Sequence, residues 1–315
     1  MSDVPRFKRI RRYVMRKKGL FSLFFLGILV FAIVFLNLCS GQKDTDSWFK
    51  RVLITNDDGI DSLGIIELAR AFSEVAETYV VAPNQNRSGS THYMSAMRRR
   101  ELKVKKRDLG ERIRAYAVDG YPADCVLIAL GGIMLDKPPD VVISGINSGP
   151  NLGEAWIGSG TIGAARVAAF CGFPAIAASG VDEEIPGALK AVSRWIVRLA
   201  KSAAFQGLGK DQFLTVDIPN VPPQGIQGVR VAQRAGLRRI PIFEKASAVE
   251  GADKNGLEVW EMIERRETGG GLRTDSDIAL YREGYIVIVP MKADEHDYDL
   301  LPKLKQDLSQ FPPYK

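Results

Sequence analysis

Residues Arg51–Gly64 read RVLITNDDGIDSLG, and this stretch indicates the fold. The apolar run Val52–Ile54 has the length and composition of a buried strand. It leads into two adjacent carboxylates, Asp57 and Asp58, and a segment with apolar residues at helical spacing follows from Leu63. Like charges side by side repel each other, and a bound divalent cation would remove that repulsion. The end of this strand is therefore a candidate cation site.

Strand-like and helix-like segments alternate from residue 50 onward. The predicted strands cover residues 51–55, 78–83, 112–118, 140–145, 173–179, 213–220 and 284–290, and the predicted helices cover residues 62–76, 122–134, 160–170 and 186–204. Short strands rich in Val and Ile, separated by helices, are typical of a parallel sheet covered on both faces. Residues 222–275 mix turn residues with charged ones, which predicts hairpins or an arm that projects from the core.

The first 39 residues carry a separate signal. Eight bases and one acid lie within residues 1–18, and the uncharged apolar run Gly19–Cys39 that follows is long enough to cross a membrane as a helix. The positive-inside rule then places residues 1–18 in the cytoplasm and the rest of the chain outside. The alternatives are a lipoprotein signal acylated at Cys39, ordinary signal cleavage just after it, a buried core helix and a weak twin-arginine signal.

The positive charge of the chain is concentrated at this end. The net charge is +6, but 35 of the 43 bases and 36 of the 37 acids lie outside residues 1–18. A basic tail on a near-neutral domain argues against nucleic-acid binding, which requires the charge on the fold itself. We predict a basic cytoplasmic region (1–18), a hydrophobic signal or anchor segment (19–39), a linker (40–49) and one domain (50–315) with residues 225–275 as its projecting arm.

Oxygen-rich loops follow the predicted strands, at the edge of the sheet where α/β proteins bind ligands. Asn56–Gly59 follows the first strand, Asn84–Gly89 the second, and Ile146–Asn151 the strand over residues 140–145. Carboxylates together with serine and asparagine oxygens suit Mg²⁺, Mn²⁺ or Ca²⁺ better than zinc. The alternative is that Asp57 only caps the next helix and that Asp58 forms part of a turn.

Zinc sites and histidine nucleophiles have little support in this chain. Its only histidines are His92 and His296, and Cys125 and Cys171 lack a second ligand at metal-binding spacing. Both cysteines lie in apolar surroundings, so we predict that they are buried thiols.

The string GSGTIG, Gly158–Gly163, is predicted to open a helix that binds an anion. Ser159, Gly160 and Thr161 would offer backbone N–H groups, two hydroxyls and the helix dipole, although a simple N-cap is the alternative. The string also fits the dinucleotide pattern G-x-G-x-x-G, but that pattern should begin directly at a strand end, and the preceding strand ends near Ser144. A cation beside an anion site favours phosphate-ester hydrolysis by metal-activated water. An aspartyl nucleophile is less favoured because no D-x-D follows the first strand.

Several segments in this order resemble the SurE family of nucleoside 5′/3′-monophosphate phosphatases, namely VLITNDDGIDSLGI, VVAPNQNRSGSTH, GYPADCV, VVISGINSGPNLG and GSGTIGAA. FLTVDIPNVP and TDSDIALYREGYIVIVP are similar to later segments of that family, so the likeness covers roughly residues 50–295. The resemblance implies a Rossmann-like three-layer α/β core with a swapped C-terminal arm. It also implies a homodimer or homotetramer that depends on one divalent cation.

The resemblance also implies three groups of site residues by position. The catalytic residues would be Asp57, Asp58 and Asn56; the phosphate-binding residues would be Ser159, Gly160, Thr161 and Asn151; the metal ligands would be Asp57, Asp58, Ser88 and Asn147. Asp57 or Asp58 would accept the proton of the attacking water, and the choice between them stays open. The implied substrates are nucleoside 5′- and 3′-monophosphates.

The N-terminus departs from this family, whose members are usually cytoplasmic and lack an anchor. A catalytic domain on the outer, periplasmic face would scavenge external nucleotides, and the alternative is a cytoplasmic location as in most of the family. Two other functions stay open: a phosphatase of a sugar phosphate or polyphosphate, and a non-catalytic nucleotide sensor tethered to the membrane. The complete set of Asp, Ser and Asn ligands argues against the sensor.

Overall fold

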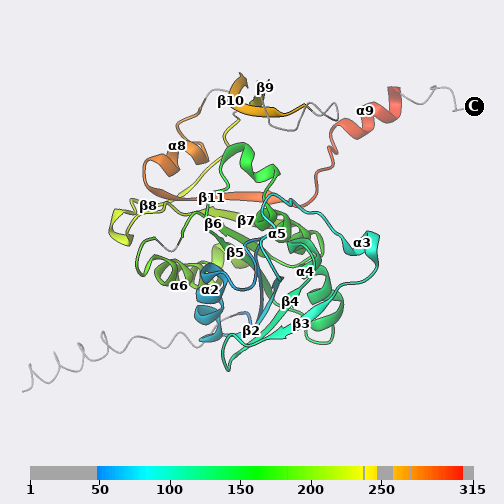
Figure 1. Cartoon of the computed structure of the whole chain (residues 1–315), viewed down its shortest axis with the longest axis vertical. Helices are drawn as coiled ribbons and strands as arrows, with labels where there is room; N and C mark the ends of the chain where they lie inside the picture. The colour runs from blue at the N-terminus through cyan, green and yellow to red at the C-terminus, as the bar shows by residue number, and fades with distance from the viewer. Residues whose placement is uncertain (1–47, 183, 237, 247–257, 270–271, 308–315) are drawn as a thin grey trace, which may run out of the picture. The chain divides into compact units, whose positions relative to one another are not determined.

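The computed structural model describes residues 48–315 apart from 183, 237, 247–257, 270–271 and 308–315 (Figure 1). Residues 47–315 form one compact unit, separate from the segment before them. Within the described part of the chain, no helix is long and apolar enough to cross a membrane. The apolar run Gly19–Cys39 and its basic flank lie outside the described residues, so the predicted anchor or signal stays a prediction.

A nine-stranded sheet forms the centre of this unit, in the order β3-β4-β2-β1-β5-β6-β7-β11-β8. Its strands are β1 (Arg51–Thr55), β2 (Glu77–Pro83), β3 (Val104–Arg107), β4 (Ile113–Val118), β5 (Val141–Asn147), β6 (Ala175–Ser179), β7 (Gln212–Asp217), β8 (Gly228–Val231) and β11 (Tyr285–Lys292). The β3–β4 and β7–β11 pairs are antiparallel, and the other pairs are parallel. The predicted, mostly parallel α/β sheet is confirmed.

Helices cover both faces of this sheet (Figure 1). The α-helices of the described residues are α2 (Leu63–Ser73), α3 (Ala96–Arg99), α4 (Pro122–Ile128), α5 (Gly160–Phe170), α6 (Ala188–Lys201), α7 (Ala203–Gln206), α8 (Asp277–Arg282) and α9 (Leu300–Asp307). The helices α2 and α6 pack together, and α4 packs on α5. Successive residues of a strand point to opposite faces, so Ile54 of β1 joins the core with α2 and α6 whereas Leu53 joins the core with α4 and α5.

Three details differ from the sequence predictions. The helix predicted over residues 122–134 changes after Ile128 into a π-helical turn, Ala129–Ile133, where two consecutive glycines weaken α-helix formation. The strands β3 and β8 were not predicted, because both lie at the sheet edges and their mostly exposed residues lack a buried apolar pattern. The prediction of a buried thiol at Cys171 is wrong, because this residue ends α5 and is exposed, whereas Cys125 is buried.

A separate two-stranded antiparallel sheet is formed by β9 (Arg238–Lys245) and β10 (Trp260–Gly269). Figure 1 shows it apart from the central sheet. Five apolar side chains on it are at least half exposed, namely Ile240, Phe243, Trp260, Met262 and Ile263. This sheet falls within the predicted arm, and exchange of the arm between subunits stays a prediction.

Candidate active site

The loops after three neighbouring strands meet at one edge of the sheet. Thr55 of β1 pairs with Ser144 of β5, so the acid pair that follows β1 lies beside the loop that follows β5. The loop after β2 joins them, because the backbone N–H of Arg87 donates to the carbonyl oxygen of Asp57 at 2.7 Å. The sheet topology therefore brings the predicted ligand residues Asp57, Asp58, Ser88 and Asn147 to the same edge.

Asp57 lies against the N-terminus of α5 and is 3% exposed. The hydroxyl of Thr161 donates to Asp57 Oδ1 at 2.5 Å, and a Cβ placed on Gly160 would lie only 2.9 Å from Asp57 Oδ2. Burial raises the pKa of Asp57 above its usual range, despite the opposing effect of hydrogen bonds from the Thr161 side chain and the first-turn backbone. The first turn of α5 thus faces a carboxylate, and a bound phosphate would share these donors with Asp57.

Asp58 is the more accessible member of the acid pair. Burial, and then the charge of Asp57, raise the pKa of Asp58 to about 6, although a contact with the backbone of Ser148 lowers it. Ionising both carboxylates is costly because their charges repel, and a cation between them would favour the doubly ionised pair. The neighbouring loops carry the hydroxyl oxygen of Ser88 and the amide oxygen of Asn147. Together with the two carboxylates, these residues fit a hard divalent cation that keeps some of its water.

The two neutral predicted ligands differ in how they are held. Ser88 is exposed, and its backbone N–H donates to Asn86 Oδ1 at 2.8 Å. Asn147 ends β5, and its Nδ2 donates to the carbonyl oxygen of Gly149 at 2.5 Å. This bond commits the amide nitrogen of Asn147, so its Oδ1 is the atom with which it would bind a cation.

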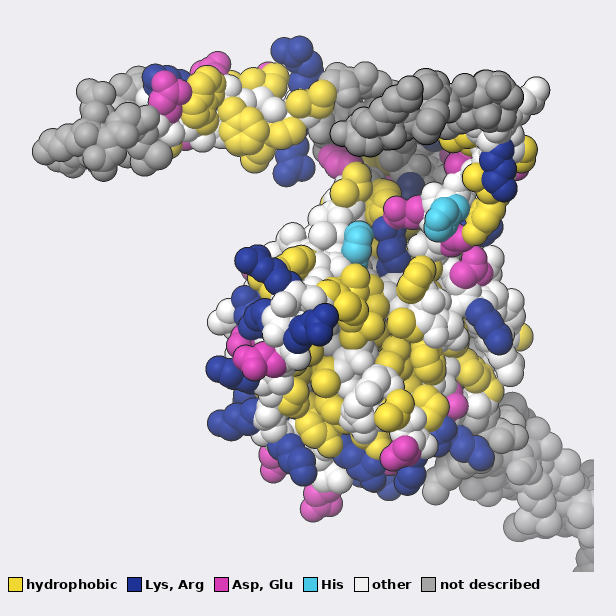
Figure 2. Space-filling view, turned by 90° about the vertical axis from the view of Figure 1, so that its right-hand side faces the viewer, with side chains coloured by type: hydrophobic (Ala, Val, Ile, Leu, Met, Phe, Trp, Pro, Cys, Tyr) yellow, Lys and Arg dark blue, Asp and Glu magenta, His cyan; other side chains and the backbone are white. Residues whose placement is uncertain are grey.

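The two histidines of the chain lie elsewhere. His92 and His296 line one pocket of about 540 Å³ with Cys171 and Asp294, and the two cyan side chains in Figure 2 mark them. In the part of the chain that the structure describes, no group of three or more His, Cys, Asp or Glu side chains is placed to hold a metal ion. The acid pair at the strand ends therefore differs in composition from a metal site built of histidine or cysteine.

Two predicted residues have clear structural roles. The Nδ2 of Asn56 donates to the carbonyl oxygen of Gly59 at 2.9 Å and to Ser62 Oγ at 2.8 Å, which fixes the turn before α2. Ser159 is the N-cap of α5, and its Oγ accepts a hydrogen bond from Ile162 N–H at 3.1 Å. The catalytic role of Asn56 and the phosphate contact of Ser159 stay predictions.

A buried ionic network that the sequence analysis missed holds Asn151. The backbone N–H of Asn151 donates to Asp217 Oδ1 at 2.6 Å, and its Nδ2 donates to Ser179 Oγ at 2.8 Å. Arg234 donates to the carbonyl oxygen of Asn151 at 2.6 Å and pairs with Asp277 at 3.0 Å. Asp217 is the last residue of β7, and the other site loops also begin where a strand ends, so its position was a usable signal. Arg234 and Asp277 lie in segments without such a pattern.

Ser90 is a second residue that the sequence analysis missed. Its Oγ is buried and, among the described residues, has no hydrogen-bond partner. This oxygen lies 2.7 Å from the position of a Cβ on Gly160, next to Asp57. An unpaired hydroxyl in this place is available to a ligand at the start of α5.

Asp124 fixes the loop that carries Ser88 and Ser90. This fully buried carboxylate accepts hydrogen bonds from Ser95 N, Ser95 Oγ, Ala96 N and Tyr121 N at 2.6–3.1 Å. The four donors come from the start of α3 and from the residue before α4. The carboxylate therefore ties the far end of the loop to the sheet-covering helix α4.

Known proteins match this chain over most of its length. The family model of survival protein SurE matches residues 52–240. The 5′-nucleotidase SurE of Desulfatibacillum aliphaticivorans is 36% identical over 255 residues, which cover 81% of this chain and 97% of the relative. The 5′-nucleotidase SurE 1 of Burkholderia lata is 34% identical over 274 residues, covering 85% and 100%. The crystal structure of the SurE protein from Aquifex aeolicus superimposes with a TM-score of 0.66 at 29% identity, covering 81% of this chain and 98% of that one.

Proposed function

The chain belongs to the SurE family, and from this premise we propose that it hydrolyses nucleoside 5′-monophosphates, and also 3′-monophosphates, with a divalent cation. It is a nucleotide phosphatase of the 5′-nucleotidase class. One observation supports the proposal above the others: the buried carboxylate of Asp57 joins the end of β1 to the first turn of α5 through Thr161, with Asp58 beside it.

The strand-end loops supply the ligands for the cation. Asp57, Asp58, Ser88 and Asn147 would hold it, and all four offer oxygen atoms. When bound, a divalent cation would polarise a phosphoryl oxygen and lower the pKa of a bound water.

The remaining groups bind the phosphate and accept the proton. The first turn of α5, with the hydroxyl of Thr161 and the backbone of Gly160, would bind phosphoryl oxygens together with Asn151. One carboxylate of the acid pair would accept the proton of the attacking water.

Phosphate release by the purified full chain tests this proposal. The substrates are nucleoside 5′- and 3′-monophosphates and a sugar phosphate, each with Mn²⁺ or Mg²⁺ and then with EDTA. Asp58→Ala should abolish turnover. Asp61→Ala is the matched control, because Asp61 lies in the same loop but is exposed and pairs with Arg107, and it should retain turnover.

Each contrary outcome changes a different part of the proposal. Nucleotide turnover that survives EDTA would refute the metal dependence. A preference for the sugar phosphate would keep the site and change the substrate. Nucleotide binding without turnover in any metal would indicate a nucleotide sensor instead of an enzyme.

The location and assembly of the enzyme are further parts of the proposal. The basic flank and the apolar run Gly19–Cys39 support a membrane-anchored or exported enzyme that faces outward. Release of the full chain from membranes by carbonate would contradict anchoring. The family resemblance supports a homodimer or homotetramer, which sedimentation of the full chain would test.

A further inference from the structure

The exposed side of α6 carries a row of bases. Lys190, Arg194 and Arg198 are exposed and recur every four residues, so they lie along one side of the helix. The helix Ala188–Lys201 contains no acidic residue. We refer to these three residues as the basic row.

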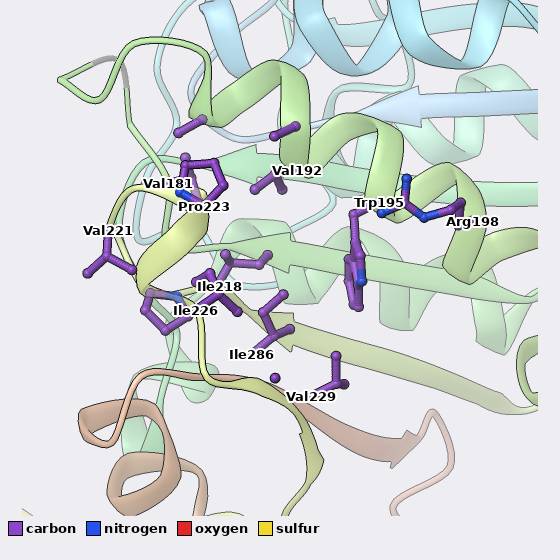
Figure 3. Close-up of a pocket in the computed structure, with 14 residues that line it drawn as sticks. Val181, Val192, Trp195, Arg198, Ile218, Val221, Pro223, Ile226, Val229 and Ile286 are labelled. Atoms are coloured by element: carbon purple, nitrogen blue, oxygen red, sulfur yellow. The ribbon is translucent and has the colours of Figure 1, made fainter. Parts of the chain in front are cut away.

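An apolar pocket of about 320 Å³ lies beside the basic row (Figure 3). Ala188, Val192 and Trp195 line it from α6, and Ile226 and Ile286 line it from the other side. Figure 3 shows Trp195 directed from α6 toward the pocket.

Arg198 belongs to both features, because it lines the pocket and ends the basic row. Among the described residues that line this pocket, it is the one that carries a charge. A positive charge therefore lies in the lining of an apolar pocket, which suits an amphiphile with an anionic head and an apolar tail.

The described chain begins beside the C-terminal end of α6. The Nε1 of Trp48 donates to the carbonyl oxygen of Ala200 at 2.8 Å, and its ring packs on Phe205. In the sequence, the apolar run ends at Cys39, only a few residues before Trp48. Even fully extended, these residues span roughly 30 Å. An anchored chain would therefore keep α6 close to the membrane surface.

We propose that this face of α6 docks on the anionic phospholipids of a membrane, with the basic row on the headgroups and part of an acyl chain in the pocket beside Trp195. Bases that contact anionic headgroups and a tryptophan at the border of an apolar region are contacts that membrane-surface helices use. The docking requires no turnover, so it stands or falls separately from the proposed nucleotidase activity.

The test uses residues 47–315, because this compact unit corresponds to nearly the whole length of the curated relatives. Flotation is measured with vesicles of phosphatidylcholine alone and with equimolar phosphatidylcholine and phosphatidylglycerol. We expect binding to the anionic vesicles only. Replacing all three residues of the basic row by Ala should lower the partition coefficient roughly a hundredfold, since each base contributes near an anionic surface.

The matched control removes the same charge from another exposed segment. Lys103, Lys105 and Lys106 lie at β3, and their replacement by Ala should leave the partition coefficient nearly unchanged. Equal losses in the two triple variants, or no binding by the parent protein, would overturn the proposal. Urea unfolding of both variants reports that they are folded, whatever their phosphatase activity.

Acyl chains with bromine labels test the pocket itself, because bromine quenches a tryptophan that lies among them. Trp195→Phe should remove most of the quenching, and quenching that persists in this variant would overturn the pocket assignment. If vesicles do not bind and the protein instead forms a dimer that Trp195→Ala dissociates, this face is an interface between two copies of the chain and the proposal fails.

Discussion

The carboxylate of Asp217 should make the stability of the domain fall as the pH rises toward neutrality. Its side chain is 1% exposed, and its Oδ2 lies 3.9 Å from Nη1 of Arg234 without a hydrogen-bond partner among the described residues. Burial raises the pKa of Asp217 to about 6, against the lowering effects of Arg234 and of the Asn151 N–H, and nearby Asp277 adds to the rise.

The size and sign of the effect follow from the two states of this carboxyl group. An aspartate in the unfolded chain titrates near 3.8. Between that pH and about 6, the folded protein binds a proton that the unfolded chain has lost, so the free energy of unfolding falls as the pH rises. A pKa difference of about two units corresponds to a loss of about 3 kcal/mol in the free energy of unfolding. This loss is absent below the unfolded pKa and complete above the folded pKa.

Asp217→Asn isolates this contribution, because the amide oxygen still accepts from Asn151 but no proton titrates. Urea unfolding of both proteins would be measured at several pH values, with equal m-values as the control for the unfolded state. Relative to wild type, the variant should gain about 2 kcal/mol between about pH 4.5 and pH 7.5. Any pH-independent cost of the substitution cancels in this comparison. A difference that stays flat with pH, or that changes in the opposite direction, would refute the reasoning.

Two further substitutions act at the same edge of the sheet. Gly160→Ala would place a Cβ 2.8 Å from the Cβ of Asp57, so kcat/KM should fall roughly a hundredfold. Gly158→Ala meets no described atom within 4 Å and should change kcat/KM little, so similar kinetics for the two variants would contradict the packing. Arg234→Met leaves the fully buried Asp277 without its ion pair, so urea unfolding should show a loss of about 3–5 kcal/mol; a loss below about 1 kcal/mol would show that the pair is not needed.

The sequence predicts the interior of the fold better than its edges. β1, β5 and β6 are buried on both faces, so their apolar runs are continuous and easy to recognise. The start of α5 was also predictable, because Ser159 caps it. The edge strands β3 and β8 expose most of their residues, so nothing in their composition separates them from loops.

The candidate site divides in the same way. The acid pair and the loops after β2 and β5 were predictable, because each directly follows a recognisable strand. The network around Asn151 was not, because its bonds to Asp217 and from Arg234 join residues 66 and 83 positions apart. Only the place of Asp217 at the end of β7 was a usable signal, because periodicity and local spacing do not indicate which distant residues pair. The burial of the Ser90 hydroxyl likewise depends on the packing of its loop against α5.

The place of β11 in the sheet has a consequence for protein synthesis. Val287 of β11 pairs with Asp217 of β7, and β8, at the edge of the sheet as described, pairs with β11. A chain emerging from the ribosome therefore exposes the open edge of β7 until some seventy more residues have been made. β8 also stays unpaired until β11 has been made. During that interval two nascent chains can join through these edges. Slow translation or a missing C-terminus would thus lead to aggregates of chains that already contain the complete acid pair and the first turn of α5.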